Sequence, residues 1–202
     1  MLISLPSFLE ATTYEDPMKK LKTFYLITLL SLLLPCFSNA ATPPKYFPNY
    51  CHWIYAISTL GDTIQLEDGS VWDISPKDGH KIFNWKSQDA LIIHPNYRWF
   101  SNYNYRILNK ATNQTIEVNL SLAPFVDGEN TNYIYDIKND CSAIMLQDQS
   151  VWHVNTKDRR IIEQWALDDL IIIGVYNKGR FESDTHILIN ANMGNHCRVR
   201  KN

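Results

Sequence analysis

Short stretches of alternating apolar and polar residues begin at about residue 53, and this alternation is typical of half-buried β-strands. The first two stretches are 53–58 and 63–67, which flank a Leu60-Gly61-Asp62 turn. Asp68-Gly69 separates them from a third stretch, 70–74, and an Asp-Gly pair tolerates the positive φ angles of a tight hairpin turn. The pattern therefore predicts three short strands joined by sharp turns.

A short helix is predicted after the third strand. Ser75 is the predicted N-cap and Pro76 is at the first helical position. Asp78 is at the third, from which its side chain can hydrogen-bond back to the N-cap residue. Two apolar residues three positions apart then form a single buried face over about two turns. The apolar run 90–94 predicts a buried strand, and a hairpin across 105–120 closes the unit.

The same pattern occurs twice in the chain. Residues 64–93 recur without a gap as 144–173, with Trp152 lying 80 positions after Trp72, and thirteen of the paired positions are identical. A repeat of about 65 to 80 residues is longer than the roughly 20 to 50 residues of solenoid and propeller repeats. Each copy is therefore expected to be a small domain with its own core.

The second copy keeps these elements with one change in a turn. Asn155 repeats the helix cap, 170–174 the buried strand and 186–200 the closing hairpin. Asp148-Gln149 replaces the Asp-Gly pair of the first copy, and a residue with a side chain is less tolerant of positive φ angles than glycine. This replacement predicts a changed or looser turn in the second copy.

Three strands, a short helix and two or three more strands suit a small, partly open barrel. We therefore expect a mainly β protein made of two tandem, duplicated β-barrel-like domains, SH3-like or OB-like, each with one short helix. The predicted boundaries are 51–120 for the first domain, 121–132 for a linker marked by Pro124 and Gly128, and 133–202 for the second domain.

The N-terminal segment has the three parts of a secretory signal peptide. Three lysines precede an apolar run, 24–35, and Ser38-Asn39-Ala40 provides small residues for cleavage. The apolar run is shorter than the roughly 20 residues of a membrane span. We predict a signal peptide over 1–40, or over 18–40 if Met18 is the true start, and an exported protein that is soluble after cleavage.

Both copies carry a hairpin motif, a Lys-Asp pair and a Trp-x-x-x-Asp motif, which in the first copy are DGSVW, KD and WKSQD within 68–89. This constellation resembles short repeated domains in uncharacterised secreted proteins of Gram-negative bacteria, including bacteria that are intracellular. The resemblance covers both copies, from Trp53 to about Arg200, and the second copy departs from it at Gln149. It implies β-rich domains and export to the periplasm or the medium of a bacterium, without an activity or site residues.

Composition excludes several classes of function. The chain carries 19 basic and 21 acidic residues, a formal net charge of −2, without the basic patch of a nucleic-acid-binding protein. Its seven glycines are widely spread, so no phosphate-binding loop is expected. The six histidines lack metal-ligand spacing, which predicts no metal and no cofactor. The acidic residues that recur in both copies fit turns and caps better than a pair of catalytic carboxylates.

Aromatic residues fall into two groups. Tryptophans 72 and 85 recur as 152 and 165 among apolar neighbours and are expected in the cores. The second group occurs only in the first copy and predicts a binding surface: Tyr97, Arg98, Trp99, Phe100, Tyr103 and Tyr105. Flat rings, amide groups and an arginine in a loop can stack on and hydrogen-bond a sugar or a peptide. The alternative is that these rings fill an interface between the two domains.

Three cysteines, an odd number, remain after removal of the predicted signal peptide: Cys51, Cys141 and Cys197. At the offset of 80 none aligns with another cysteine, and Cys197 aligns with Glu117. Cys141 with Cys197 would staple the second domain, whereas Cys51 with Cys197 would tie the two ends together. Either pairing leaves one thiol for an intermolecular disulfide, and the remaining alternative is three unpaired thiols.

Together these features predict a secreted or periplasmic, non-enzymatic binding module whose ligand is a protein or a glycan. One alternative is a structural envelope protein that is cross-linked through its odd cysteine. The other alternative is a hydrolytic enzyme, which would require a carboxylate or thiol with a strongly shifted pKa in a deep pocket.

Overall fold

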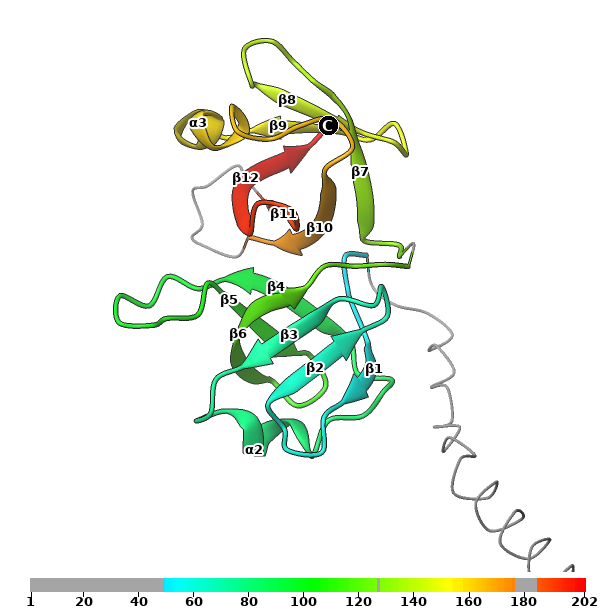
Figure 1. The fold of residues 1–202 in the computed structure, drawn as a ribbon, viewed down its shortest axis with the longest axis vertical. Coiled ribbons are helices and arrows are strands. Elements are labelled where there is room, and N and C mark those ends of the chain that lie inside the picture. Colours follow the sequence, from blue (N-terminus) through cyan, green and yellow to red (C-terminus); the bar gives the residue numbers. More distant parts are fainter. Residues whose placement is uncertain (1–48, 127, 177–184) are drawn as a thin grey trace, which may run out of the picture. The chain divides into compact units, whose positions relative to one another are not determined.

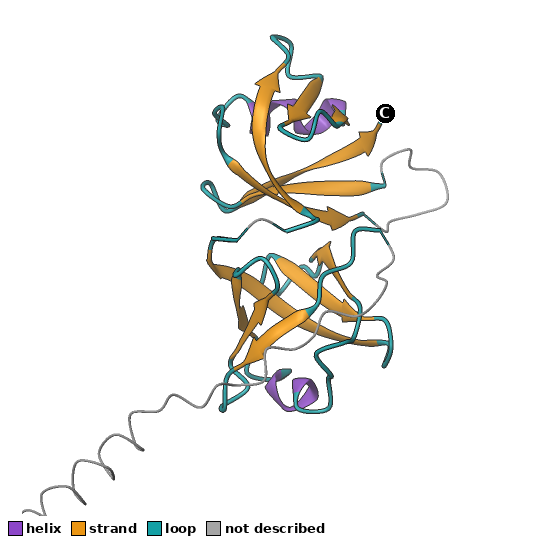
Figure 2. Cartoon of the chain, turned by 90° about the vertical axis from the view of Figure 1, so that its right-hand side faces the viewer, coloured by secondary structure: helices purple, strands orange, loops and turns teal. Residues whose placement is uncertain are grey.

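The computed structural model describes residues 49–126, 128–176 and 185–202, so the predicted signal peptide lies outside the described residues. Two six-stranded antiparallel sheets make up this part of the chain, one an open half-barrel and the other a closed barrel (Figure 1). Each sheet carries a short α-helix (Figure 2). The expectation of a mainly β protein with two barrel-like units is therefore confirmed.

The first sheet has the spatial order β1-β2-β3-β6-β5-β4. Its strands are β1 (Ile54–Ile57), β2 (Thr63–Leu66), β3 (Val71–Ile74), β4 (Leu91–Pro95), β5 (Tyr105–Asn109) and β6 (Gln114–Leu122). Helix α2 (Gly79–Ile82) lies between β3 and β4 in the sequence. Neighbouring strands are antiparallel throughout, as expected for strands joined by short turns.

The second sheet closes into a barrel with the order β10-β11-β12-β9-β8-β7. Its strands are β7 (Thr131–Ile137), β8 (Ala143–Leu146), β9 (Val151–Val154), β10 (Leu170–Val175), β11 (His186–Asn190) and β12 (Asn195–Lys201). A 3₁₀ turn, η1 (Thr156–Asp158), leads directly into helix α3 (Arg159–Ile162). The predicted linker, 121–132, contains the end of β6 and the start of β7 as well as the connection between them.

The first hairpins of the two sheets pair in the same way. Trp72 faces Ile64 across β2 and β3, and Trp152 faces Ile144 across β8 and β9. These equivalent pairs are 80 residues apart in the sequence, which is the offset of the sequence comparison.

The offset becomes 81 in the last two strands of each sheet. Leu91 faces Asn109 between β4 and β5, whereas Ile171 faces Asn190 between β10 and β11. One extra residue therefore lies between β10 and β11. Because side chains alternate between the two faces of a strand, this single residue changes which side chains correspond.

The changed offset corrects one alignment. Cys197 corresponds to Ile116 and not to Glu117, because the pairing of β11 with β12 matches that of β5 with β6 at an offset of 81. Cys197 and Ile116 are both fully buried, so the thiol occupies an apolar core position. The true counterpart of Glu117 is Arg198.

The prediction of a changed or looser turn at Asp148-Gln149 is wrong. Gln149 adopts a φ of 67°, close to the 82° of Gly69, so the turn keeps its left-handed residue. The amide N of Gln149 donates to the Leu146 carbonyl at 2.9 Å, and that of Gly69 donates to the Leu66 carbonyl at 3.0 Å. The turn is retained because these hydrogen bonds and the flanking strands outweigh the cost of a side chain at positive φ.

The predicted helix start is correct in one copy only. The side chain of Asn155 accepts a hydrogen bond from the Lys157 amide at 2.9 Å and caps η1 as expected. In the first sheet, α2 begins at Gly79, and Asp78 makes no side-chain cap. The Asp78 carboxylate instead accepts the backbone N–H of Glu117 at 2.9 Å, which ties the segment before α2 to β6.

Tryptophans form the centres of both cores, as the sequence predicts. Trp72 and Trp152 are fully buried, and each indole N–H donates to a serine two residues earlier, Ser70 at 2.9 Å and Ser150 at 2.8 Å. A buried indole needs such a partner because an unsatisfied N–H is costly in an apolar environment.

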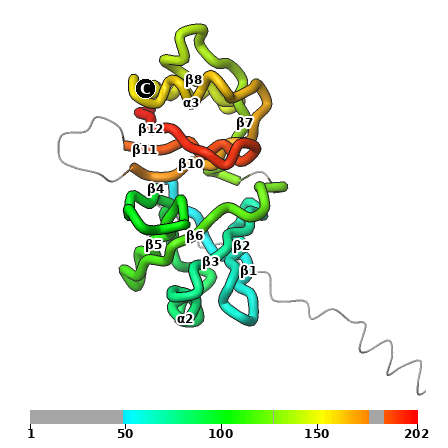
Figure 3. Tube along the Cα trace, turned by 60° about the vertical axis from the view of Figure 1, so that its left-hand side comes forward, coloured from blue at the N-terminus to red at the C-terminus, as the bar shows by residue number. Residues whose placement is uncertain are grey.

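Strand β10 is buried on both of its faces. Ile171 and Ile173 belong to the core of the closed barrel, whereas Ile172 packs into the core of the first sheet. Strands β4 and β10 are in contact (Figure 3). A Cβ atom on Gly174 would lie 2.8 Å from the Ile93 carbonyl oxygen, so the absence of a side chain permits this close approach. The continuous apolar run of β10 reflects burial from two sides.

Candidate binding site

The predicted aromatic surface lies on and beside the loop 96–104, which joins β4 to β5. The amide N of Asn96 donates to the Asn104 carbonyl at 2.8 Å, so the two ends of the loop continue the hairpin. Within the loop, the amide N of Ser101 donates to the Arg98 carbonyl at 3.1 Å, which forms a turn at the outer end. The loop is therefore an ordered extension of the sheet.

A buried carboxylate on β6 holds one side of this loop. Glu117 accepts hydrogen bonds at Oε1 from Nη1 of Arg98 at 3.0 Å, and at Oε2 from Lys77 at 2.7 Å and Ser101 at 2.9 Å. The Ser101 hydroxyl also accepts from the side-chain amide of Asn96 at 2.9 Å. The loop backbone is thus connected to β6 through charged and polar side chains.

The environment of Glu117 favours its ionised form. Burial acts to raise the pKa of this carboxyl, but the hydrogen bonds from Lys77 and Ser101 and the charges of Lys77 and Arg98 outweigh burial. The pKa of Glu117 is therefore below its ordinary value. An ionised acceptor makes stronger hydrogen bonds than a neutral one, so Glu117 is a strong anchor for the loop.

An asparagine on β6 holds the other side of the loop. Oδ1 of Asn119 accepts the backbone N–H of Asn104 at 2.7 Å, and Nδ2 of Asn119 donates to the Asn102 carbonyl at 3.0 Å. Both functional groups of the amide are used by the loop backbone. The loop is consequently fixed on both sides before any ligand binds.

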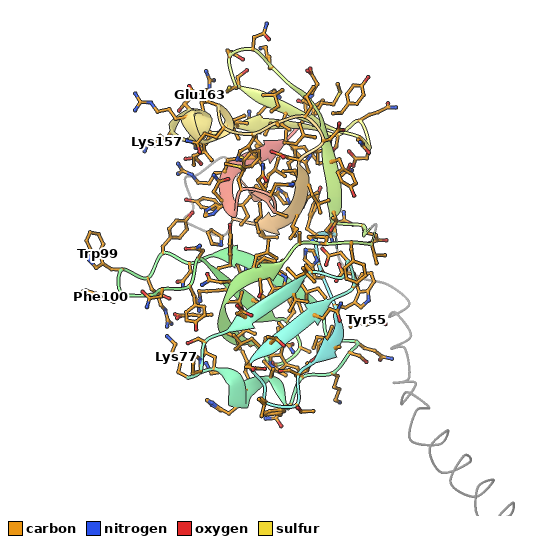
Figure 4. The ribbon with its side chains drawn as sticks, viewed as in Figure 1. Tyr55, Lys77, Trp99, Phe100, Lys157 and Glu163 are labelled. Atoms are coloured by element: carbon orange, nitrogen blue, oxygen red, sulfur yellow. The ribbon has the colours of Figure 1, made fainter. Side chains whose placement is uncertain are left out.

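Two aromatic rings project from this fixed loop into solvent. Trp99 is 91% exposed and Phe100 is 96% exposed, and both point away from the sheet (Figure 4). We call these two residues the aromatic tip. Contiguous exposed apolar surface is more informative than single exposed residues, and here two adjacent large rings are almost fully exposed.

The other predicted aromatic residues have different positions. Tyr105 is buried in the core of the first sheet, with its ring centroid 5.6 Å from Trp72 and 5.4 Å from His196 of β12. Tyr97 is half-exposed and makes an edge contact with Tyr176, which follows β10, at 6.1 Å. These two rings fill contacts between the two sheets, as the alternative interpretation expected.

Tyr103 has an intermediate position in the group. Its ring is partly buried, and its backbone N–H donates to the Ser101 hydroxyl at 3.2 Å. Tyr103 therefore belongs to the structure of the loop more than to its exposed end.

A pocket of about 430 Å³ opens at the base of the same loop. Its polar and charged lining comes from His94, Asn96, Tyr97, Arg98, Arg106 and Thr115, and its apolar lining from Pro95 and Leu108. No carboxylate is among these lining residues. We call this cavity the basic pocket.

The basic pocket was not foreseen from the sequence. Arg106 stands in an alternating strand like many surface residues, and its proximity to His94 depends on the register of β5 against β4, in which the two residues pair. The only available signal was that Arg106 follows directly after the predicted aromatic group.

The three cysteines of the described residues form no disulfide with one another. Cys51 and Cys197 are buried, and burial raises the pKa of the Cys51 thiol. Cys141 is partly exposed and has a φ of 51°, in the turn where the first sheet has Gly61 with a φ of 70°. Of these thiols, Cys141 is the one that solvent reaches to an appreciable extent.

The recurring aspartates have structural partners. Asp89 accepts from the side-chain amide of Asn109 at 2.6 Å, and Asp169 accepts from that of Asn190 at 2.7 Å. Within the part of the chain that the structure describes, no group of three His, Cys, Asp or Glu side chains could hold a metal ion, and no helix is long and apolar enough to cross a membrane.

Comparison with known proteins adds no family to this description. No protein-family model, curated protein or solved structure matches the chain. The site must therefore be interpreted from its own geometry.

Proposed function

We propose that this protein is an exported, non-enzymatic binding module that contacts a protein or a glycan through the aromatic tip. The observation that carries the proposal is the exposure of Trp99 and Phe100 on a loop that Glu117 and Asn119 already hold in place. The predicted signal peptide and the resemblance to secreted bacterial proteins support export. The matching strand pairs of the two sheets support an origin by duplication.

The physical reason for this assignment is the combination of apolar area with order. Tryptophan and other aromatic residues contribute a large share of the energy at interfaces, since they bury much surface with few rotatable bonds. A loop that is already ordered loses little conformational entropy on binding. An exposed tip of this kind costs solubility, and binding to a partner is the function that accounts for it.

The test compares three forms of the full protein on arrays of glycans and of purified envelope and host-surface proteins. The forms are the parent, the Trp99→Ala/Phe100→Ala double variant and a Tyr135→Ala control, since Tyr135 is an exposed ring on β7 in the second sheet. We expect ligands that bind the parent and the control to lose binding to the double variant. Ligands that bind all three forms equally would overturn the proposed role of the tip.

Cysteine cross-linking is the second candidate function, and only Cys141 favours it. The burial of Cys51 and Cys197 opposes intermolecular disulfides at those positions in the folded protein. A cross-linked envelope protein would give higher-mass species on non-reducing gels that disappear in a Cys141→Ser variant. Persistence of those species in the variant would exclude the Cys141 route.

A further inference from the structure

The basic pocket contains a positive charge that has no ion-pair partner among the residues that the structure describes. Arg106 lies on β5 and lines the pocket. Its Nε is shielded from water and has no hydrogen-bond partner within 49–126, 128–176 and 185–202. Buried polar groups are normally paired, because desolvation without a new hydrogen bond is costly. A guanidinium whose Nε is unpaired and whose side chain lines a cavity is therefore a feature that a ligand could satisfy.

The neighbours of Arg106 in the sheet do not compensate its charge. It pairs in register with His94 on β4 and with Glu117 on β6. The Glu117 carboxylate is occupied by Lys77, Arg98 and Ser101. No ion pair joins Arg106 to Glu117 or to any other carboxylate of the described residues.

The environment of His94 favours the neutral imidazole. Burial lowers the pKa of His94, and the charge of Arg106 acts in the same direction, against the hydrogen bond to Val175. Nδ1 lies 2.8 Å from the Val175 carbonyl oxygen and therefore carries the proton that it donates. In this form Nε2 is an acceptor, so His94 neither adds positive charge nor competes with Arg106 for an anion.

The remaining lining is suited to a small polar ligand. Arg98 uses Nη1 toward Glu117, and its side chain also borders the pocket. Thr115 contributes a hydroxyl, while Pro95 and Leu108 contribute apolar walls. A volume of about 430 Å³ is within the range of small-molecule sites. The guanidinium fork matches the planar oxygens of a carboxylate or the oxygens of a phosphate.

We propose that the basic pocket binds an oxyanion, a carboxylate or a phosphate, carried on a ligand of about the size of one sugar, with Arg106 as its main anchor. The pocket lies at the base of the loop that carries the aromatic tip, so this inference deepens the proposed function by naming the chemistry of a ligand group near the loop. Its physical basis is separate, because an oxyanion can occupy the pocket whether or not the tip contacts a partner.

The second sheet provides an internal comparison for this assignment. The counterpart of Arg106 at the offset of 81 is Ile187, which is fully buried in the core shared with the first sheet. The counterpart of His94 at the offset of 80 is Gly174. The same strand positions therefore serve packing in the second sheet and line a cavity in the first.

The experiment titrates the full protein with four probes at low ionic strength: inorganic phosphate, glucuronate, glucose 6-phosphate and glucose. Binding is followed by calorimetry and by NMR shifts of the Arg106 Nε–H. We expect the three anions to bind and to shift this resonance, and glucose to bind far more weakly. Tighter binding of glucose 6-phosphate than of inorganic phosphate would show that the sugar contributes, whereas equal binding would assign the site to a free oxyanion.

Variants make this test specific. Arg106→Gln should weaken the binding of each anion by about tenfold or more, since it removes charge-assisted hydrogen bonds. Arg106→Lys should recover part of the affinity because it restores the charge without the planar fork. Arg160→Gln is the control, because Arg160 is an exposed arginine on α3. Thermal unfolding of each variant establishes that it is folded.

Three results would overturn the oxyanion assignment: anions that bind no better than glucose, unchanged anion binding in Arg106→Gln, or an equal loss in Arg160→Gln. The Trp99→Ala/Phe100→Ala variant separates this inference from the proposed function. Anion binding that persists in that variant while array binding is lost supports both proposals. Anion binding lost only with the tip would contradict a pocket centred on Arg106.

Discussion

The two sheets share their strand order and differ at the seam where the first and fourth strands meet. In the second barrel, β7 pairs with β10 through three consecutive residue pairs that begin at Thr131. In the first sheet, the corresponding segment contributes one isolated bridge, His52 to Leu91. The same pattern of alternating residues therefore yields a closed barrel in one copy and an open sheet in the other.

The open seam is compensated by contacts from the second barrel. His52 is fully buried, with Nδ1 2.8 Å from Oε1 of Glu67 and Nε2 3.2 Å from the Ile173 carbonyl oxygen of β10. Both ring nitrogens face acceptors, so the geometry favours the doubly protonated imidazolium. The comparison shows that a small sheet can leave its own barrel open when a neighbour supplies the missing packing and hydrogen bonds.

A second difference lies on the outer face of the sheets. Asp78 accepts the backbone N–H of Glu117, and Asp158 accepts that of Arg198, the corresponding residue, each at 2.9 Å. The Arg198 side chain then pairs with Asp158 itself at 2.7 Å. Glu117 cannot pair with an aspartate and instead holds the loop 96–104. The difference in charge between Glu117 and Arg198 thus gives an anchored loop in the first sheet and a structural ion pair in the second.

Removal of His52 should have the largest effect on stability. His52→Ala removes the ion-pair partner of the nearly buried Glu67 carboxylate, which keeps only the hydrogen bond from the Trp53 N–H, and breaking a buried pair in this way costs about 3 kcal/mol of unfolding free energy. Urea unfolding of the variant measures this loss. Asn132→Ala changes the corresponding position of β7 and should cost much less, because the Asn132 side chain bonds to its own neighbour Tyr133. Equal losses would contradict the compensation of the open seam.

The same contact predicts a dependence of stability on pH. Burial acts to lower the pKa of His52, but the charge and hydrogen bond of Glu67, with Asp68, outweigh it and raise the pKa to about 9. Because the folded pKa exceeds the ordinary value, the stabilisation is complete below about pH 6.5 and is lost as the pH rises through 9. We expect a loss of about 3 kcal/mol between pH 6.5 and 10. Urea titrations across this range should show a flatter profile for His52→Ala than for the parent.

Neutralising the loop anchor should have a smaller and more local effect. Glu117→Gln weakens the hydrogen bonds to Arg98 and Lys77 and should cost about 1–2 kcal/mol of unfolding free energy. Hydrogen exchange should accelerate in the amides of 96–104, which lose their tether. Arg198→Gln at the corresponding position should leave exchange in this loop unchanged. Slow exchange throughout the loop in Glu117→Gln would show that Asn119 alone is sufficient to hold it.

The turn that differs between the hairpins should give the smallest effect, and with the opposite sign. Gln149→Gly relieves a side chain at a φ of 67° and should raise the unfolding free energy by about 0.5 kcal/mol. The reverse change, Gly69→Gln, should destabilise the protein, because a Cβ at Gly69 would lie 2.5 Å from the Phe125 ring. Thermal unfolding of both variants checks the two signs, and a destabilising Gln149→Gly would contradict the strain at this turn.

Local features were predictable where neighbouring residues control them. The hairpins follow from alternation and turn residues, the buried indoles from apolar neighbours, and the cap at Asn155 from a side chain that reaches two residues along the chain. The role of Asp78 was missed because its partner lies 39 residues away on β6. The sequence predicted all the aromatic residues of this group as one binding surface. It could not distinguish the exposed aromatic tip from Tyr105, which is buried in the core.

The sequence by itself determined the strands, their turns and the tryptophan-centred cores, because alternation and turn propensity act over a few residues. Only the tertiary structure decided that one barrel closes while the other stays open, that His52 is buried against β10, and that Arg106 lines a pocket at the base of the loop 96–104. These features depend on strand register and on packing between residues far apart in the chain. A one-residue change of offset is enough to exchange which side chains meet, and no local pattern records it.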